Sequence, residues 1–189
     1  MPLPRAPKRA LQHGQRPVCC AALFNSKVAA RAEVEAPVEA NTLLALGDLE
    51  RRLGRTDEAR GLYDRALALY EREQAGLGQA NTLRSMGDAA RLAGGYAEAA
   101  AIYQRALMNY ESEQEPVGTA CTFAELSRCW HACGEQAKCD DALEKALQWA
   151  DRTNIDAVLH YVFAALEEVT GGSEQAEAWM ASRAGGIAD

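Results

Sequence analysis

The feature that most constrains this chain is a segment that occurs twice. Residues 40–79 and 80–119 align without a gap, and 19 of the 40 positions are identical. Residues 120–159 continue in the same register, with six identities to the second copy. A repeat of this length indicates a structural unit that stacks on copies of itself, because a single unit cannot bury its own apolar faces.

Each copy is predicted to form two helices around a glycine. In the first copy, Leu43, Leu46, Leu49 and Leu53 recur three or four residues apart and make an apolar stripe on one helix. Gly54 follows, where a left-handed cap conformation ends a helix at little cost. The second stripe consists of Ala59, Leu62, Tyr63, Ala66, Leu67 and Tyr70. The predicted unit is an antiparallel helix hairpin whose two stripes become buried when the copies stack.

The small and aromatic positions of these hairpins resemble the tetratricopeptide repeat. They are Leu43, Leu46-Gly47, Gly54, Ala59-x3-Tyr63 and Ala66 in the first copy, and Leu83, Met86-Gly87, Gly94, Ala99-x3-Tyr103 and Ala106 in the second. The third copy offers Phe123, Leu126-Ser127, Trp130, Gly134, Cys139-x3-Leu143 and Ala146. The period is forty residues here and about thirty-four in the common form. This longer form is similar to the repeats of kinesin light chains and of sensor regions in bacterial signalling ATPases.

The resemblance implies an all-α fold, a right-handed α-solenoid of stacked antiparallel helix hairpins. Three repeats are expected at 40–79, 80–119 and 120–159, and 160–189 is expected to form a partial fourth hairpin or capping helices around Gly171 or Gly172. Gly14 and Cys19 lie forty residues before Gly54 and Ala59, which makes 18–39 a candidate helix of a decayed repeat. The proline-rich start, 1–17, is predicted to be a disordered basic tail.

Charge is distributed unevenly along the chain. Residues 1–32 contain six basic residues and no acidic one, whereas the remainder contains 14 basic and 27 acidic residues. An acidic body argues against nucleic acid as a partner, because that affinity comes mainly from neutralised phosphates. No run of eighteen apolar residues is present, so no membrane span is expected.

The basic start of the chain has two interpretations. A positive segment followed by a short apolar run, here "VCCAALF", also occurs in organelle transit peptides and secretory signals. The run is only seven residues long and no clean cleavage site follows it, so a cytoplasmic location is expected instead.

The sequence contains no familiar catalytic motif. There is no glycine-rich phosphate loop, no G-x-S-x-G and no H-E-x-x-H, and His13, His131 and His160 are scattered. We therefore expect no enzymatic activity and no cofactor.

One local cluster suggests another function. Cys129, Cys133 and Cys139 lie around His131, and zinc accepts such ligand types, so a metal- or redox-responsive regulator is the alternative hypothesis. In the alignment these cysteines replace leucines and alanines of the earlier copies. Free cysteine packs like a small apolar residue, and core packing is the favoured interpretation, with no metal site.

The resemblance also implies that the first helix of each hairpin lines a concave groove. Polar positions away from the apolar stripe of these helices are Asn41, Asp48, Arg51, Asn81, Arg84, Asp88, Arg91 and Arg128. Asparagine can pair with a peptide backbone, and arginine can hold a carboxylate with two parallel bonds. We therefore predict a scaffold that binds an acidic or C-terminal peptide of another protein.

Three alternatives to this groove remain open. The groove residues can be ordinary exposed ion pairs three or four positions apart. Exposed ends of the solenoid can drive self-association. The chain can also be a fragment of a larger signalling protein.

Overall fold

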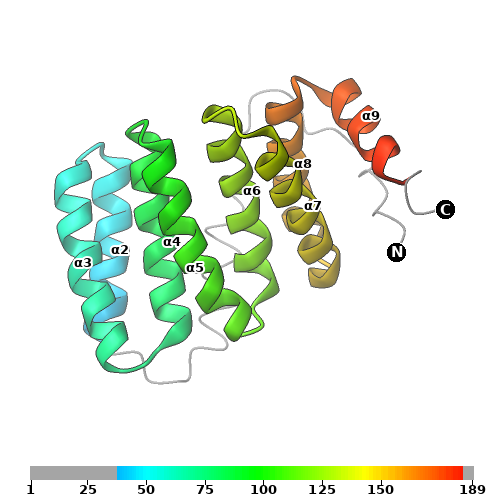
Figure 1. Cartoon of the computed structure of the whole chain (residues 1–189). Helices are drawn as coiled ribbons and strands as arrows, with labels where there is room; N and C mark the ends of the chain where they lie inside the picture. Colours follow the sequence, from blue (N-terminus) through cyan, green and yellow to red (C-terminus); the bar gives the residue numbers. More distant parts are fainter. Residues whose placement is uncertain (1–37, 185–189) are drawn as a thin grey trace.

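The computed structural model describes residues 38–184, with side chains up to Ser182. These residues form eight α-helices and no strand (Figure 1). The helices are α2 (Val38–Arg52), α3 (Thr56–Arg72), α4 (Gly76–Leu92), α5 (Tyr96–Ser112), α6 (Pro116–Ala132), α7 (Gln136–Thr153), α8 (Asp156–Thr170) and α9 (Ser173–Ala184). Within this range, no helix combines the length and the apolar character that crossing a membrane requires.

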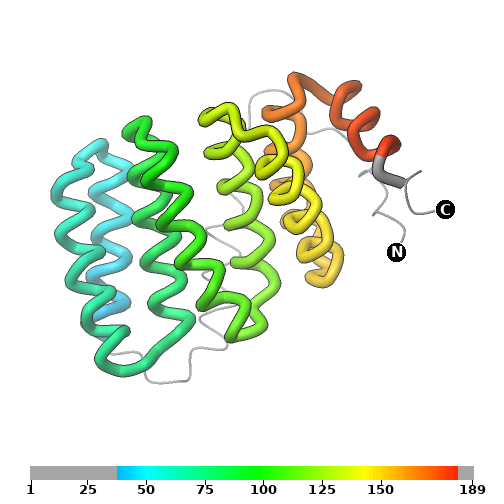
Figure 2. Tube along the Cα trace, in the orientation of Figure 1, coloured from blue at the N-terminus to red at the C-terminus, as the bar shows by residue number. Residues whose placement is uncertain are grey.

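Consecutive helices pack as antiparallel hairpins, and the hairpins follow one another in a row (Figure 2). The first helices of successive hairpins, α2, α4, α6 and α8, also contact one another across the repeats. The backbones of the second helices α3, α5 and α7 do not approach one another in this way in the described part of the chain, although Arg60 of α3 pairs with Glu98 of α5 at 3.0 Å through side chains. The first helices therefore lie on the inner side of the stack, and the predicted solenoid of helix hairpins is confirmed.

The forty-residue period is visible in the backbone of the turns. Gly54, Gly94 and Gly134 join the two helices of a hairpin and have φ angles of 78°, 83° and 76°. These values lie in the left-handed region, which glycine adopts without strain, as the sequence predicted. Between hairpins, Gln74, Gln114 and Asn154 take the same conformation at φ 55°, 52° and 49°.

The core contains residues of both helices of each hairpin, and the tyrosines of the second helices are among its largest side chains. Tyr63 and Tyr103 are fully buried, and each ring lies against the backbone of the first helix at a glycine. A Cβ atom added to Gly47 would lie 2.5 Å from Cε1 of Tyr63, and one added to Gly87 would lie 2.5 Å from Cε1 of Tyr103. The repeated Gly and Tyr therefore allow the two helices of a hairpin to approach closely.

The leucine stripe of the first copy is only partly buried, contrary to the sequence interpretation. Leu43 is buried, but Leu46, Leu49 and Leu53 are 43%, 50% and 56% exposed. The equivalent Ala89 of the second copy is buried against Ala59 and Tyr63 of the preceding hairpin. No described residue precedes α2, so no described helix covers this face, which we call the leucine face (Leu46, Leu49, Leu53).

The predicted end segments fall partly outside the described residues. The basic tail 1–17 and residues 18–37 of the candidate decayed helix lie outside them, and Val38 and Glu39 belong to α2. At the other end, α8 begins at Asp156, ahead of the boundary expected at 160. Gly171 and Gly172 form the turn to α9, with φ angles of 94° and 139°. Residues 185–189 also lie outside the described part.

Candidate functional site

The recurring asparagines of the inner helices are each bonded to a tyrosine of the same hairpin. The Tyr70 hydroxyl donates to Oδ1 of Asn41 at 2.7 Å, and the Tyr110 hydroxyl donates to Oδ1 of Asn81 at 2.7 Å. Asn41 is exposed and Asn81 is half-buried. Among the described residues neither amide nitrogen has a hydrogen-bond partner, so within this part of the chain each asparagine is anchored through its oxygen and can donate through its nitrogen.

The recurring aspartates of the inner helices are also bonded to tyrosines of their own hairpins. The Tyr63 hydroxyl donates to Asp48 at 2.9 Å, and the Tyr103 hydroxyl donates to Asp88 at 2.6 Å. Each bond joins the first helix of a hairpin to its second helix, beside the close approach at glycine. This internal bonding gives the repeated aspartates a structural role that the sequence interpretation did not assign.

Burial keeps the tyrosine hydroxyls protonated, and therefore able to donate, up to a higher pH than an exposed tyrosine. Burial raises the pKa of Tyr70 to about 12. Burial and the nearby Asp88 carboxylate raise the pKa of Tyr103 well above its ordinary value. Burial likewise raises the pKa of Tyr110, while the Arg84 guanidinium opposes that shift. At neutral pH these hydroxyls hold the inner polar residues in fixed positions.

The first two arginines of the predicted groove lie beside these aspartates. Arg51 Nη2 is 3.6 Å from Asp48 Oδ1, and its Nε donates to the Tyr63 hydroxyl at 3.3 Å. Arg84 Nη1 is 3.8 Å from Asp88 Oδ2, and its side chain is only 12% exposed. Both guanidinium groups are therefore held in place by residues of their own hairpins.

The buried carboxylate of Glu125, in the third repeat, forms ion pairs with the other two arginines, Arg91 and Arg128. Glu125 is 5% exposed, and its oxygens lie 2.8 Å from Nε of Arg91 and 2.8 Å from Nη1 of Arg128. The Tyr161 hydroxyl of α8 also donates to Glu125. This one residue therefore connects α4, α6 and α8 along the inner side of the stack.

Sequence reasoning missed Glu125, although the alignment contained a signal. The equivalent positions in the first two copies hold Ala45 and Ser85, so a charged residue appears where the repeats have small ones. A carboxylate at a position that is buried in this repeat needs a cation beside it. The arginines Arg91 and Arg128 were identified from the sequence, but their common partner was not.

The first helices of the hairpins, from Asn41 to Glu168, thus carry a row of polar and charged residues that we call the inner face. Its residues are Asn41, Asp48, Arg51, Asn81, Arg84, Asp88, Arg91, Glu125, Arg128 and Glu168. The four arginines are matched by four carboxylates, whereas residues 33–189 as a whole carry 27 acidic and 14 basic residues. The inner face is therefore electrically balanced, whereas the rest of residues 33–189 has an excess of acidic residues.

The cysteine cluster does not form a ligand set. Cys129, Cys133 and Cys139 are free thiols, and within the described residues no group of three or more His, Cys, Asp or Glu side chains is placed to hold a metal ion. Burial raises the pKa of Cys129 to about 12 and that of Cys139 to about 11. Cys133 is exposed, so its interpretation as a packing residue was wrong.

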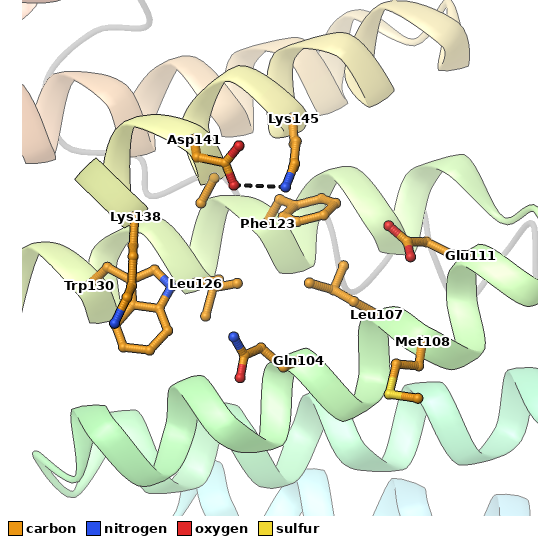
Figure 3. A pocket seen from close by; sticks show the side chains of 11 residues that line it. Gln104, Leu107, Met108, Glu111, Phe123, Leu126, Trp130, Lys138, Asp141 and Lys145 are labelled. Carbon is orange, nitrogen blue, oxygen red and sulfur yellow. Dashed lines mark hydrogen bonds and ion pairs between the residues drawn. The ribbon is translucent and has the colours of Figure 1, made fainter. Parts of the chain in front are cut away.

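A cavity of about 290 Å³ lies between α5, α6 and α7 (Figure 3). Its apolar lining includes Leu107, Phe123 and Trp130. The Lys138 ammonium lies 4.6 Å from the Trp130 ring centre, and the Lys145 ammonium lies 5.7 Å from that of Phe123. Lys145 also pairs with Asp141 at 2.7 Å, so the cavity is bordered by both signs of charge. We call it the outer pocket.

Comparison with known proteins supports the repeat assignment. Residues 38–112 match the family model described as tetratricopeptide repeat. No curated protein matches the chain. Thus the family match covers the first two hairpins of the described structure.

Solved structures extend the likeness beyond the family match. BtubC (BKLC) from P. vanneervenii aligns with a TM-score of 0.58 at 19% identity, over 70% of this chain and 55% of that chain. A protein from Podospora anserina, named as a kinesin light chain with nearly identical TPR-like repeats, aligns with a TM-score of 0.56 at 16% identity. That alignment covers 88% of this chain and 84% of the other. The chain therefore spans about half the length of BtubC, and both likenesses concern the fold.

Proposed function

We propose that this chain binds a segment of another protein along its inner face. The proposal rests on the tetratricopeptide-repeat match over residues 38–112 and on the likeness in fold to solved repeat structures. Stacked repeats of this kind create extended concave surfaces that serve as binding sites. The observation that carries the proposal is the row of four arginines, fixed by carboxylates and tyrosines, on the inner side of an acidic chain. A ligand that carries carboxylates, from acidic side chains or from a C-terminus, fits this row best.

The fixed geometry favours binding because little order has to be created when the partner arrives. Arg91 and Arg128 are already oriented by Glu125, and Asn41 and Asn81 by tyrosine hydroxyls. Preorganised side chains lose less conformational entropy on binding than mobile ones. The asparagine amides then supply donors to the backbone of an extended segment, which gives register without fixing its sequence.

An affinity capture with matched variants tests the inner face. We expect partner proteins, identified by mass spectrometry, to be retained by the wild type and lost when Arg128→Gln removes an inner-face cation. The control is Lys145→Gln, which removes one cation from the outer pocket and is expected to retain the partners. Circular dichroism checks that both variants are folded. Partners that are lost with Lys145→Gln and kept with Arg128→Gln would place binding at the outer pocket and contradict the proposal.

The leucine face supports a second candidate function, self-association. Leu46, Leu49 and Leu53 are exposed on α2 at one end of the described stack. No large apolar side chain is exposed on α8 or on the described part of α9 at the other end. Two copies are therefore expected to pair through their leucine faces, in a symmetric contact of like with like.

Light scattering over a range of protein concentrations measures this pairing. We expect a dimer that dissociates when Leu49→Glu places a charge in the contact. The matched control is Leu92→Glu on α4, because Leu92 is 61% exposed and lies outside the leucine face. A wild-type protein that stays monomeric at every concentration would exclude self-association through this surface.

We also predict that the protein is located in the cytoplasm. The hypothesis that the chain is part of a larger signalling protein is likewise a prediction from the sequence.

A further inference from the structure

One equivalent position of the inner face holds residues of different charge in successive hairpins. Asp48, Asp88, Arg128 and Glu168 lie forty residues apart, on α2, α4, α6 and α8. The first two are held by the hydroxyls of Tyr63 and Tyr103, and their side chains are 28% and 16% exposed. Glu168 is 64% exposed, and within the described residues its partner is Arg128 of the preceding hairpin.

The Arg128 guanidinium has one buried contact and one contact that faces solvent. Its Nη1 donates to the buried Glu125 at 2.8 Å, and its carbon lies 5.4 Å from the centre of the Tyr161 ring. Its Nε donates at 2.8 Å to Oε2 of Glu168, whose side chain is mostly in water. Glu125 and Tyr161 therefore fix the orientation of Arg128, while the Glu168 carboxylate occupies its outward edge.

We propose that Arg128 is the residue that takes the carboxylate of a partner, and that Glu168 occupies this position as an internal substitute in the free protein. This inference rests on the proposed binding of a carboxylate-bearing segment to the inner face. The exchange costs little because one carboxylate replaces another and the displaced Glu168 side chain is 64% exposed. The Arg128 side chain, which is 13% exposed, keeps its pair with Glu125. Arg128 is the inner-face arginine whose ion pairs include a mostly exposed carboxylate, since Glu168 is 64% exposed. The carboxylates paired with Arg51, Arg84 and Arg91 are 28%, 16% and 5% exposed, so a ligand reaches them less easily.

The pairing of Arg128 with Glu168 favours ligands that carry a carboxylate over neutral ones. Without a carboxylate, a ligand that displaced Glu168 would leave the Arg128 Nε without an acceptor, which carries a desolvation penalty. A ligand with a carboxylate restores the bond and adds its other contacts. Glu168 therefore discriminates against neutral segments, and its removal is expected to strengthen the binding of acidic ones.

The test uses a fluorescein-labelled hexaglutamate peptide and measures its fluorescence anisotropy with the wild type and three variants. Glu168→Gln is expected to tighten binding about two- to fivefold, the range that corresponds to removing a competing exposed ion pair. Glu167→Gln is the matched control, since it neutralises the adjacent exposed carboxylate and is expected to change the affinity much less. Arg128→Gln is expected to abolish binding, and labelled hexaglutamine is expected not to bind the wild type.

A second measurement follows the Nε–Hε resonance of Arg128 by NMR while acetate is added. We expect acetate to shift this resonance in Glu168→Gln and to leave it nearly unchanged in the wild type, because Glu168 then holds the site. Equal affinities of Glu168→Gln and Glu167→Gln, or weaker binding by Glu168→Gln, would overturn the internal-substitute role while the proposed function stands. If hexaglutamate binds neither the wild type nor Glu168→Gln and acetate shifts nothing, the carboxylate-binding function itself fails, and this inference with it.

Discussion

Replacing Gly87 by alanine is expected to lower the free energy of unfolding by about 1–3 kcal/mol, although alanine favours a helix. The added Cβ would lie 2.5 Å from a carbon of the Tyr103 ring. That ring is fully buried and its hydroxyl is bonded to Asp88, so it cannot move aside without breaking the bond. Urea unfolding followed by circular dichroism measures the change.

The matched control is Gly61→Ala in α3, where no atom lies within 4 Å of the added Cβ. There the substitution is expected to raise the free energy of unfolding by about 0.5–1 kcal/mol, because alanine loses less backbone entropy than glycine in a helix. Equal effects at both positions would show that close approach of the two helices is not what Gly87 provides.

Replacing Glu125 by alanine is expected to cost about 3–5 kcal/mol of unfolding free energy, because it leaves Arg91 and Arg128 without their shared buried partner. The backbone accepts a small residue here, since the earlier repeats carry Ala45 and Ser85 at this position. The loss is therefore electrostatic. Urea unfolding measures it, with Glu168→Gln, at a 64% exposed site, expected to cost less than about 1 kcal/mol.

A double variant separates the charge effect from packing. Adding Arg91→Leu to Glu125→Ala removes one of the two arginines that have lost the Glu125 carboxylate. The double variant is expected to recover part of the lost free energy of unfolding, because apolar replacements of buried ion pairs are often tolerated. If the double variant is less stable than Glu125→Ala alone, Arg91 stabilises the fold through contacts other than Glu125, and the electrostatic account of this site is wrong.

The hairpins and their turns were predictable because they depend on local chemistry. The glycines at 54, 94 and 134 end helices through the conformational freedom of glycine. The spacing of Ala59, Tyr63 and Ala66 identifies the buried side of α3, and all three are buried. Burial of Leu46 and Leu49 was predicted wrongly, because an apolar stripe in a sequence does not say whether a neighbour covers it.

The candidate site was predictable only in part. The sequence pointed to Asn81, Asp88 and Arg91 as inner-face residues, and the structure gives each of them a partner. Their partners are Tyr110, Tyr103 and Glu125, which lie fifteen to thirty-four residues away in the sequence. The repeat pattern assigns the two tyrosines to packing and gives no role to Glu125. Whether these residues bind a peptide remains the proposal that the capture experiment tests.

The sequence by itself therefore determined the repeat, the helix hairpins and the helix-ending glycines, since periodicity and glycine chemistry act over a few residues. The tertiary structure alone decided which polar residues meet. Glu125 joins Arg91, Arg128 and Tyr161 only because three inner helices pack side by side. Burial in that contact turns ordinary charged residues into a fixed cluster, and burial arises from stacking that no single repeat contains.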